Sequence, residues 1–187
     1  IIGGGVAEPD LVERLQVYST KIYSTYGMTE TLSHVALRLL NGRNRSDFYE
    51  TLPGITVRTD EHNCLVIRAP YLDGEIATND IAEVTGKNNF RWVGRWDNVI
   101  NSGGLKISPE ILEERIGQIF TRLHISNSFF IHGIPDKKLG QKVSLVMEAP
   151  LKKETLETIR QEFIHSFSPY EIPKVFFESD TFIYTNT

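Results

Sequence analysis

Cysteine is almost absent from this sequence of 187 residues, because Cys64 is the single one. One cysteine excludes a disulfide framework within the chain and a cysteine-rich zinc site. It is also typical of proteins from a reducing compartment, so we expect a cytoplasmic protein. Long apolar runs are missing as well, since no stretch approaches the roughly 20 apolar residues that cross a bilayer. The sequence therefore predicts no membrane span.

A large net charge is lacking too. The 20 Lys and Arg residues and the 24 Asp and Glu residues leave a formal net charge of -4. Residues 1–96 and residues 97–187 each hold 10 of the basic and 12 of the acidic residues. Because neither half has a basic excess, we expect neither nucleic acid nor an anionic membrane as a partner. The length fits one large domain or two small ones.

The first half of the chain predicts a small sheet or barrel beside one short helix. The helix is expected from Asp10 to about Val17, and Lys21–Ser24 is a short strand candidate. Further on, short β-rich runs alternate with turns, and Glu61–Asn63 has the composition of a hairpin turn. The predicted strands there are Ile55–Arg58, Leu65–Ala69, Glu75–Thr78 and Phe90–Val93.

The second half predicts a compact α+β unit, with a boundary near Gly94–Asn98. Ser108 and Pro109 should begin a helix on which apolar residues recur at helical spacing. The elements expected after it are strands Ile125–His132 and Lys142–Glu148, joined by Gly133–Asp136, then a helix Glu154–Phe167 and a strand Lys174–Glu178. We therefore predict two domains, residues 1–96 and 97–187.

One candidate for chemistry is the segment YGMTET, Tyr26 to Thr31. A glycine beside a hydroxyl and a carboxylate suits a nucleotide, with backbone amides near phosphate, Glu30 on Mg²⁺ and the Tyr26 ring against a base. The alternative is an ordinary glycine turn in which Thr29 caps a helix and Glu30 offsets its dipole. These residues alone leave both interpretations open.

Three further segments carry weaker signals. The run Gly3, Gly4, Gly5 either lets a ligand ring lie flat on peptide bonds or forms a flexible turn. Asp80, at the end of a predicted strand, either accepts hydrogen bonds from ribose hydroxyls or belongs to an Asn-Asp turn. The stretch Gly94–Glu110 is either a linker with a glycine hairpin or a hinge that rotates one domain against the other.

Taken together and in order, these segments resemble the adenylate-forming superfamily of acyl-CoA synthetases, adenylation domains and luciferases. YGMTET is similar to the family signature YGxTE, and DGEIATND, ending at Asp80, is similar to DGWxxTGD with Asn79 in place of glycine. GRWDNVINSGGLKISPEILEE resembles GRxDxxIxxxGxxxxPxEIE. FIHGIPDKKLGQKV and SPYEIPK resemble the GxPDxxxGQ hairpin and the YKIPK turn. The resemblance covers essentially the whole chain.

The resemblance implies a fold and a set of site residues. The fold is α/β and α+β: the C-terminal part of a large adenylate-forming domain, with a barrel-like sheet, followed by a small mobile α+β domain. The nucleotide site implied is made of Gly3, Gly4 and Gly5 along the adenine and acyl pocket, Tyr26 on adenine with Gly27 and Met28 beside it, Thr29 on phosphate, Glu30 on Mg²⁺, and Asp80 and Arg95 on the ribose.

The resemblance also implies a moving second domain. Asp97 would be the hinge, while Gly103, Gly104 and Lys106 would belong to the loop that swings in beside the pantetheine tunnel. The activity implied is ligation of a small carboxylic acid to coenzyme A with ATP and Mg²⁺, through an acyl-adenylate. YGMTET followed by Ser33 and His34 resembles bacterial o-succinylbenzoate–CoA ligases of menaquinone synthesis, which makes Ser33 and His34 candidate substrate residues.

Two departures from the family pattern bear on activity. The chain opens at Ile1 inside an apolar run and lacks the Gly-rich phosphate loop, and residues 185–187 resemble those just before the family's catalytic lysine. We therefore expect a fragment that does not catalyse alone. An adenylation domain that loads a carrier protein, and a non-catalytic nucleotide-binding module, stay open as alternatives. Oligomeric state is not predicted.

Overall fold

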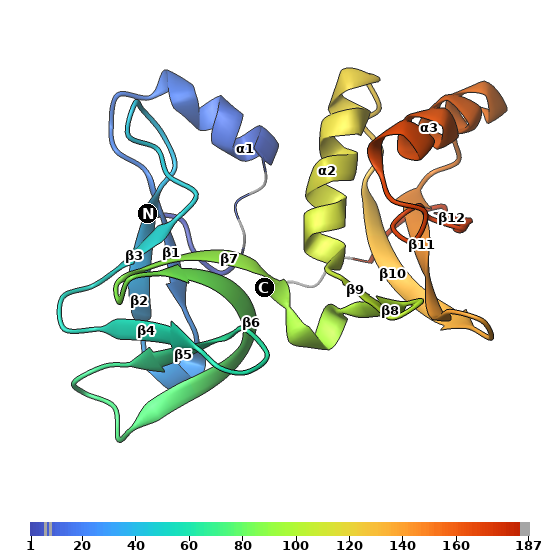
Figure 1. Cartoon of the computed structure of the whole chain (residues 1–187). Helices are drawn as coiled ribbons and strands as arrows, with labels where there is room; N and C mark the ends of the chain where they lie inside the picture. The colour runs from blue at the N-terminus through green and yellow to red at the C-terminus, as the bar shows by residue number, and fades with distance from the viewer. Residues whose placement is uncertain (6, 8, 184–187) are drawn as a thin grey trace. The chain divides into compact units, whose positions relative to one another are not determined.

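A computed structural model describes residues 1–5, 7 and 9–183. The segment 185–187, in which the sequence resembles the approach to a family lysine, lies outside the described residues. The chain divides into two compact units, one made of Ile1–Trp96 and the other beginning at Asp97. Figure 1 follows the chain from the sheet of the first unit to the helices of the second.

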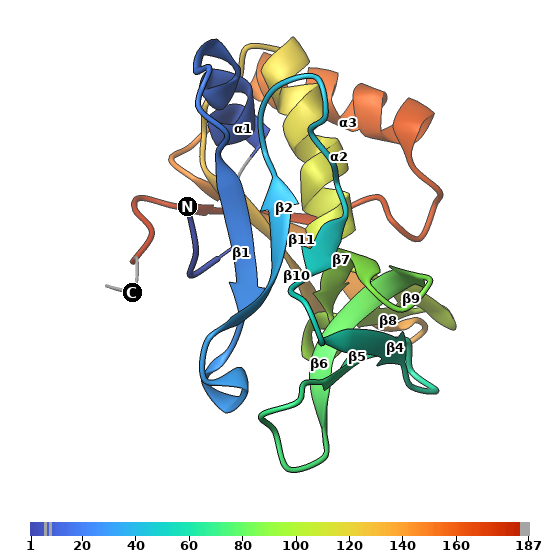
Figure 2. The ribbon, with the colours of Figure 1, turned by 90° about the vertical axis from the view of Figure 1, so that its left-hand side faces the viewer.

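The first unit is built on one antiparallel sheet of seven strands in the order β1-β2-β3-β7-β6-β5-β4. A helix and a 3-10 turn precede it, α1 (Pro9–Arg14) and η1 (Leu15–Val17). The strands are β1 (Tyr23–Gly27), β2 (His34–Leu39), β3 (Tyr49–Thr51), β4 (Thr56–Thr59), β5 (Cys64–Arg68), β6 (Glu75–Thr85) and β7 (Asn89–Arg95). Figure 2 shows β1 and β2 side by side, as their register requires.

The sheet curls around one apolar core, to which most of its strands contribute buried residues. Phe90, Leu65 and Ile67 are fully buried, and the Tyr49 and Phe90 rings stack with centroids 5.3 Å apart. Each such side chain contributes about 1.5–3 kcal/mol by leaving water. The barrel-like sheet predicted for this half is therefore present.

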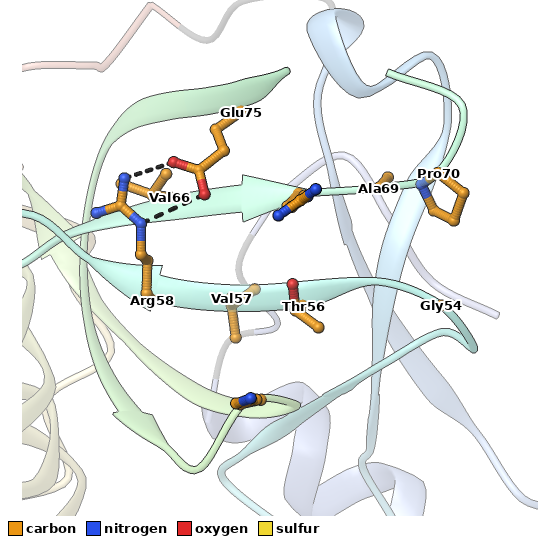
Figure 3. A pocket seen from close by; sticks show the side chains of 10 residues that line it. Gly54, Thr56, Val57, Arg58, Val66, Ala69, Pro70 and Glu75 are labelled. Atoms are coloured by element: carbon orange, nitrogen blue, oxygen red, sulfur yellow. Dashed lines mark hydrogen bonds and ion pairs between the residues drawn. The ribbon is translucent and has the colours of Figure 1, made fainter. Parts of the chain in front are cut away.

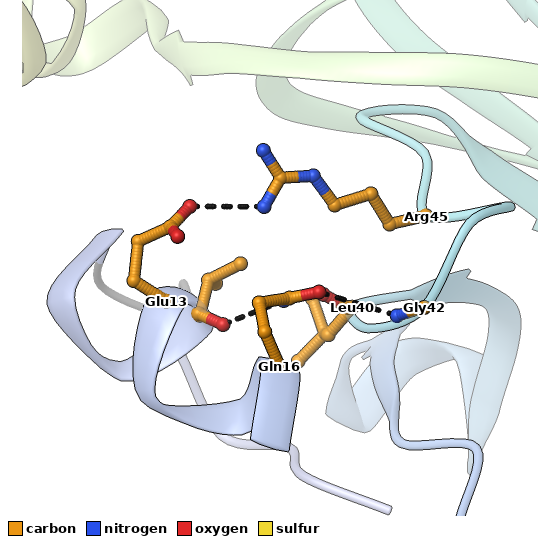
Figure 4. A network of polar contacts seen from close by, with 6 residues as sticks. Glu13, Gln16, Leu40, Gly42 and Arg45 are labelled. Atoms are coloured by element: carbon orange, nitrogen blue, oxygen red, sulfur yellow. Dashed lines mark hydrogen bonds and ion pairs between the residues drawn. The ribbon is translucent and has the colours of Figure 1, made fainter. Parts of the chain in front are cut away.

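Polar side chains fasten the α1 segment to the sheet. Gln16 donates to the Leu40 carbonyl at 2.9 Å and accepts from the Gly42 amide at 3.2 Å, while Arg45 pairs with Glu13 at 2.9 Å (Figure 4). The buried Asn41 side chain accepts from the Ile22 amide at 2.8 Å. Its amide nitrogen donates to the carbonyls of Leu15, Tyr18 and Thr20. Side-chain bonds thus hold a segment that shares few ladder bonds with the sheet.

The predicted strand bounds in this unit need three corrections. The strand expected at Lys21–Ser24 lies at Tyr23–Gly27, and β6 continues to Thr85 instead of ending at Thr78. Asp80 is therefore inside a strand, opposite Arg95, and not at a strand end or in a turn. Strands β2 and β3 were not predicted, although the turn signals Asn41–Gly42 and Pro53–Gly54 follow them. With only 3 residues, β3 is shorter than the runs of about 4–8 residues that indicate a strand.

The second unit packs two helices against one face of a five-stranded sheet. Its elements are η3 (Trp96–Asn98) at the boundary, β8 (Ile100–Ser102), β9 (Leu105–Ile107), α2 (Pro109–Arg122), β10 (Phe129–Asp136), β11 (Gly140–Glu148), α3 (Lys153–Ser166) and β12 (Val175–Ser179). The order is β10-β11-β8-β9, with β12 parallel to β11. Leu112, Ile116 and Phe163 meet Val143 and Leu145 in its core.

The two helices and three main strands of this unit follow the predicted order, with two differences. The strand predicted at Ile125–His132 lies at Phe129–Asp136, so it begins four residues later and includes Gly133–Asp136, and the turn to β11 is Lys137–Leu139. Asp136 closes that turn, because its Oδ1 accepts from the amides of Lys138 at 2.9 Å and Leu139 at 3.0 Å. Ser108 caps α2 as predicted, accepting from the Ile111 amide at 3.5 Å with Pro109 in the first turn.

Candidate functional site

Three of the predicted site residues meet on the first unit: Tyr26 from β1, Asp80 from β6 and Arg95 from β7. The Tyr26 hydroxyl donates to Asp80 Oδ2 at 2.6 Å, and Arg95 Nη1 lies 3.8 Å from Asp80 Oδ1. In a flat sheet, Tyr26 on β1 and Asp80 on β6 would be four strand spacings apart, or about 19 Å. The curl of the sheet therefore creates this cluster, which we call the Asp80 cluster.

The Asp80 cluster is a charged carboxylate on an aromatic support. Asp80 is buried, with 8% of its surface exposed, whereas about half of the Arg95 side chain is exposed. The Tyr26 ring packs edge-on against Phe90 and Tyr49, with centroids 5.0 and 5.8 Å away. Burial, followed by the hydrogen bond to Asp80, raises the pKa of the Tyr26 hydroxyl well above its ordinary value. Tyr26 therefore remains a hydrogen-bond donor to Asp80 across the physiological pH range.

Replacing Tyr26 by Phe is expected to lower the free energy of unfolding by about 1.5–3 kcal/mol at pH 7, the range for a hydrogen bond to a charged group. The raised pKa gives the sign of the pH dependence, because a neutral tyrosine stabilises fully below its unfolded pKa of 10.0 and less as pH rises above it. The difference between wild type and Tyr26→Phe should shrink above about pH 10. Urea unfolding from pH 7 to pH 11 measures it, with the exposed Tyr18→Phe as the control. A difference that stays constant to pH 11 would contradict this assignment.

The Thr29–Glu30 segment forms a 3-10 turn, η2 (Thr29–Thr31), directly after β1. The hydroxyl that closes it belongs to Thr31, which accepts from the Met28 amide at 3.0 Å and donates to the Ser33 carbonyl at 2.7 Å. The alternative in which Thr29 caps a helix is therefore wrong. Thr29 and Glu30 are exposed, and neither side chain has a hydrogen bond or ion pair within the described part of the chain. Their polar groups face solvent, available to a ligand.

Gly27 is required by close packing of two backbones. A Cβ atom on Gly27 would lie 2.6 Å from His34 Cα and 2.7 Å from the Ser33 carbonyl oxygen, where β1 and β2 shift register. Of the Gly3–Gly5 run, Gly3 faces Thr25, next to the bridge between Ile2 and Ser24, and Gly4 has a φ of +92°. The run therefore lies beside the strand that carries Tyr26.

Gly27→Ala is expected to destabilise the protein by about 1–3 kcal/mol, because the added methyl group meets backbone that cannot turn aside. Gly117 offers the matched control. It lies within α2 with no atom within 4 Å of a built Cβ, so Gly117→Ala should stabilise by about 0.5–1 kcal/mol. Thermal and urea unfolding measure both variants. Equal effects of the two substitutions would show that the contact at Gly27 is not restrictive.

The candidate substrate residues Ser33 and His34 lie together at the start of β2. Ser33 Oγ is 3.2 Å from His34 Nδ1, and both residues are exposed. They come after η2 and its C-cap Leu32, and His34 pairs with Gly27 across the β1–β2 connection. The structure thus places one exposed hydroxyl and one exposed imidazole side by side at the start of β2.

The predicted hinge residue, Asp97, is in the middle of η3 and opens the second unit. The residue before it is fixed by a contact that the sequence analysis missed: the Trp96 indole stacks on the His62 imidazole, with centroids 4.5 Å apart and planes at 21°. His62 comes from the β4–β5 hairpin. The stack therefore ties the last residue of the first unit to its sheet.

The Gly103–Gly104 loop is a two-residue hairpin turn between β8 and β9. Both glycines have positive φ, +60° and +86°, which is the requirement of the tight turn that suits twisted strands. The Tyr170 ring of the SPYEIPK segment covers Gly103 so closely that a side chain there would require the ring to move. Lys106 is exposed on β9. Two of the resembling motifs thus meet at one hairpin.

The GIPDKKLGQ motif supports the same hairpin from β10 and β11. Gln141 Oε1 accepts from the Asn101 amide at 2.8 Å, and the Gly103 amide donates to the Leu139 carbonyl at 2.9 Å. Gly133 leaves room for Ile100, whose side chain lies about 3.0 Å from a built Cβ. The motif therefore positions the backbone that carries Gly103, Gly104 and Lys106.

Comparison with known proteins gives a consistent result. No family model matches the chain. It is 41% identical, over 99% of its length, to an acyl-CoA synthetase (AMP-forming)/AMP-acid ligase II-like protein from Dyadobacter fermentans, with a TM-score of 0.54. This chain is related to the AMP-forming acyl-CoA synthetases. It spans 53% of that synthetase, so it corresponds to about half of the relative.

The names of two other proteins similar to this chain also specify the acid that is activated. The chain is 25% identical over its whole length to a 2-succinylbenzoate–CoA ligase of Staphylococcus aureus, of which it covers 42%. The o-succinylbenzoate CoA synthetase of Bacillus subtilis, solved in complex with an acyl-adenylate intermediate, shares the fold at 20% identity with a TM-score of 0.70, over 96% of this chain and 42% of that one. The predicted fold class is confirmed: this is the fold of the C-terminal part of such enzymes.

Two negative findings concern the described residues alone. Within residues 1–5, 7 and 9–183, no three or more His, Cys, Asp and Glu side chains are grouped as metal ligands. Among the helices of the same residues, none has the length and apolar character needed to cross a membrane.

Proposed function

We propose that this chain is part of an ATP-dependent acid–CoA ligase, with 2-succinylbenzoate as the acid. The enzyme class of its relatives supports the first statement, and the names of two of them support the second. The relatives are roughly twice as long as this chain, so the activity is proposed for the parent protein. Because the chain spans only about half of those relatives, we expect the isolated chain to show no exchange of pyrophosphate into ATP.

The Asp80 cluster is the observation that carries the proposal. A carboxylate accepts up to four hydrogen bonds, and Asp80 accepts one from the Tyr26 hydroxyl. The remaining lone pairs are suited to a pair of ribose hydroxyls, and Arg95 Nη1 lies 3.8 Å from Asp80 Oδ1 beside them. Tyr26 fixes the orientation of the carboxylate before ligand arrives. A preset acceptor loses less entropy on binding than a mobile one.

Glu30 fits a role at Mg²⁺ through the chemistry of its donor set. Mg²⁺ in nucleotide sites is typically held by one or two carboxylates, with phosphate oxygens and water completing the octahedron. Glu30 supplies one exposed carboxylate with no partner among the described residues, one residue from the Thr29 hydroxyl. When bound, the ion would neutralise phosphate charge. Thr29 would donate a hydrogen bond to the same phosphate.

The reaction has two steps, and the two units would serve them in turn. An oxygen of the acid attacks the α-phosphate of ATP, the bond to the β-phosphate oxygen breaks, and pyrophosphate leaves. The CoA thiolate, having lost its proton, then attacks the acyl carbon and AMP departs. Rotation about Asp97 would bring the Gly103–Gly104 turn and Lys106 to the second step. Ser33 and His34 would hydrogen-bond the second carboxylate or the ketone of the acid.

A thioester assay of the parent protein tests the proposal. With ATP, Mg²⁺, CoA and 2-succinylbenzoate, we expect 2-succinylbenzoyl-CoA and AMP in equal amounts. Adenylate formation without transfer to CoA, but with transfer to a phosphopantetheine carrier protein, would instead identify an adenylation domain. ATP binding without pyrophosphate exchange for any acid would identify a non-catalytic module. Activity with benzoate equal to that with 2-succinylbenzoate would reject the proposed substrate.

A further inference from the structure

A recess of about 590 Å³ in the first unit is lined by residues of β4, β5 and β6 together with Pro70 and Lys87, and by none of the Asp80 cluster. Figure 3 shows β4 and β5 crossing it, with Arg58 and Glu75 at one end and Pro70 at the other. Its volume falls within the range of small-molecule sites. The side chains along β6 alternate, with Glu75 exposed and Asp80 buried, so the recess and the Asp80 cluster use different faces of that strand.

Strand register gathers the charged side chains of the recess. Arg58 on β4 is opposite Val66 on β5, and Arg68 on β5 is opposite Glu75 on β6. Residues directly opposite in antiparallel strands share a face, so these four side chains project to the same side. Val66 lines the recess and is only 3% exposed. The floor of the recess is therefore apolar.

The recess has more positive than negative charge. Arg58, Arg68 and Lys87 line it with a single carboxylate, Glu75. That carboxylate is engaged by Arg58, whose Nη2 lies 2.5 Å from Glu75 Oε2 and whose Nε donates to Oε1 at 3.5 Å. Arg68 lies opposite Glu75 and, after Arg58, its charge also lowers the pKa of that carboxyl, but neither the Arg68 nor the Lys87 side chain forms a hydrogen bond or a close ion pair among the described residues. Two cations in one recess are thus available to an anion.

We propose that this recess binds a small organic dianion, through Arg68 and Lys87, with its apolar part against Val66 and Pro70. The guanidinium of Arg68 can engage a carboxylate or a phosphate with two parallel hydrogen bonds, and Lys87 adds a point charge. Carboxylate and phosphate share this oxyanion chemistry. The site is independent of the proposed nucleotide site, because it uses neither Tyr26 nor Asp80.

Binding of phenyl phosphate to the 187-residue chain tests the proposal, by calorimetry and by amide NMR shifts of Thr56 and Val66. We expect saturable binding that persists at 0.15 M salt, where purely surface attraction is screened beyond about 8 Å. Arg68→Gln and Lys87→Gln should each weaken it about tenfold or more. Arg43→Gln, the same charge change on an exposed loop of the same unit, should leave it unchanged. Circular dichroism confirms that each variant is folded.

Three comparisons sharpen the test. Glu75→Gln releases Arg58 and removes the single carboxylate, so it should tighten phenyl phosphate binding. Inorganic phosphate should bind more weakly than phenyl phosphate, because it leaves the apolar floor uncovered. Phthalate in place of phenyl phosphate shows which oxyanion the site prefers. No saturation at millimolar phenyl phosphate, equal weakening by Arg43→Gln, or inorganic phosphate binding as tightly as the phenyl ester would each overturn the proposal.

Discussion

Glu30→Gln in the parent ligase is expected to slow acyl-adenylate formation by about 100- to 1,000-fold, the usual cost of removing one electrostatic contact to a transition state. Glutamine keeps the shape of the side chain but removes the negative charge that a divalent cation requires. Pyrophosphate exchange with 2-succinylbenzoate measures the effect. Excess Mg²⁺ should restore part of the lost rate, since the variant weakens an ion site and does not abolish the fold.

Measurements of stability distinguish a role of Glu30 at the metal ion from a role in holding the fold. Glu30 is exposed in a 3-10 turn whose closing hydrogen bonds come from Thr31, so Glu30→Gln should change the free energy of unfolding by less than about 0.5 kcal/mol. Thr31→Val is the matched comparison, because it removes the buried hydroxyl that holds the turn and should destabilise by about 1–3 kcal/mol. Normal exchange by Glu30→Gln, with or without a stability loss, would remove Glu30 from the site.

Asp97→Pro is expected to separate the two half-reactions. Proline fixes φ near -65° and keeps the preceding residue out of the helical region, so it stiffens Trp96 as well as residue 97. If the second unit must rotate about this point, transfer of the acyl group to CoA should fall at least tenfold further than adenylate formation. Single-turnover assays of the two steps measure the difference, and bound acyl-adenylate should accumulate.

Two controls keep the hinge prediction sharp. Asp97→Ala removes the carboxylate but leaves the backbone free, so both half-reactions should remain within about threefold of wild type if flexibility is what matters. Tryptophan fluorescence reports whether the Trp96–His62 stack survives in the proline variant. An equal fall in both half-reactions with the stack intact would show that Asp97 is not a selective hinge. Unchanged rates would make the segment a linker.

Features of this fold that depend on a short motif could be predicted from the sequence. Ser108 and Pro109 start a helix because a hydroxyl can cap it and proline has no amide to lose. Gly103 and Gly104 form a tight hairpin turn because both positions need positive φ. The two helices of the second unit show their apolar faces at helical spacing. Each of these features depends on residues within a few positions of one another.

Longer-range features escaped sequence reasoning. The extent of β6 was underestimated because Asn79 and Asp80 are turn-forming residues, yet pairing with β7 holds Asp80 opposite Arg95 in the ladder. Strands β2 and β3 are decided by pairing with their neighbours, because the turn signals Asn41–Gly42 and Pro53–Gly54 mark only where they end. The stack of His62 on Trp96 joins residues 34 positions apart, and no local pattern could indicate it.

By itself, the sequence determined the order of the main elements, the family resemblance and a list of polar residues, because these depend on residue type and short spacing. Only the tertiary structure decided which of those residues meet. Tyr26 reaches Asp80 because the sheet curls back on itself, and Arg58, Arg68 and Glu75 share one face because antiparallel register aligns them. Curl and register are set by packing of the whole core around Phe90, Leu65 and Ile67, a property that no short segment contains.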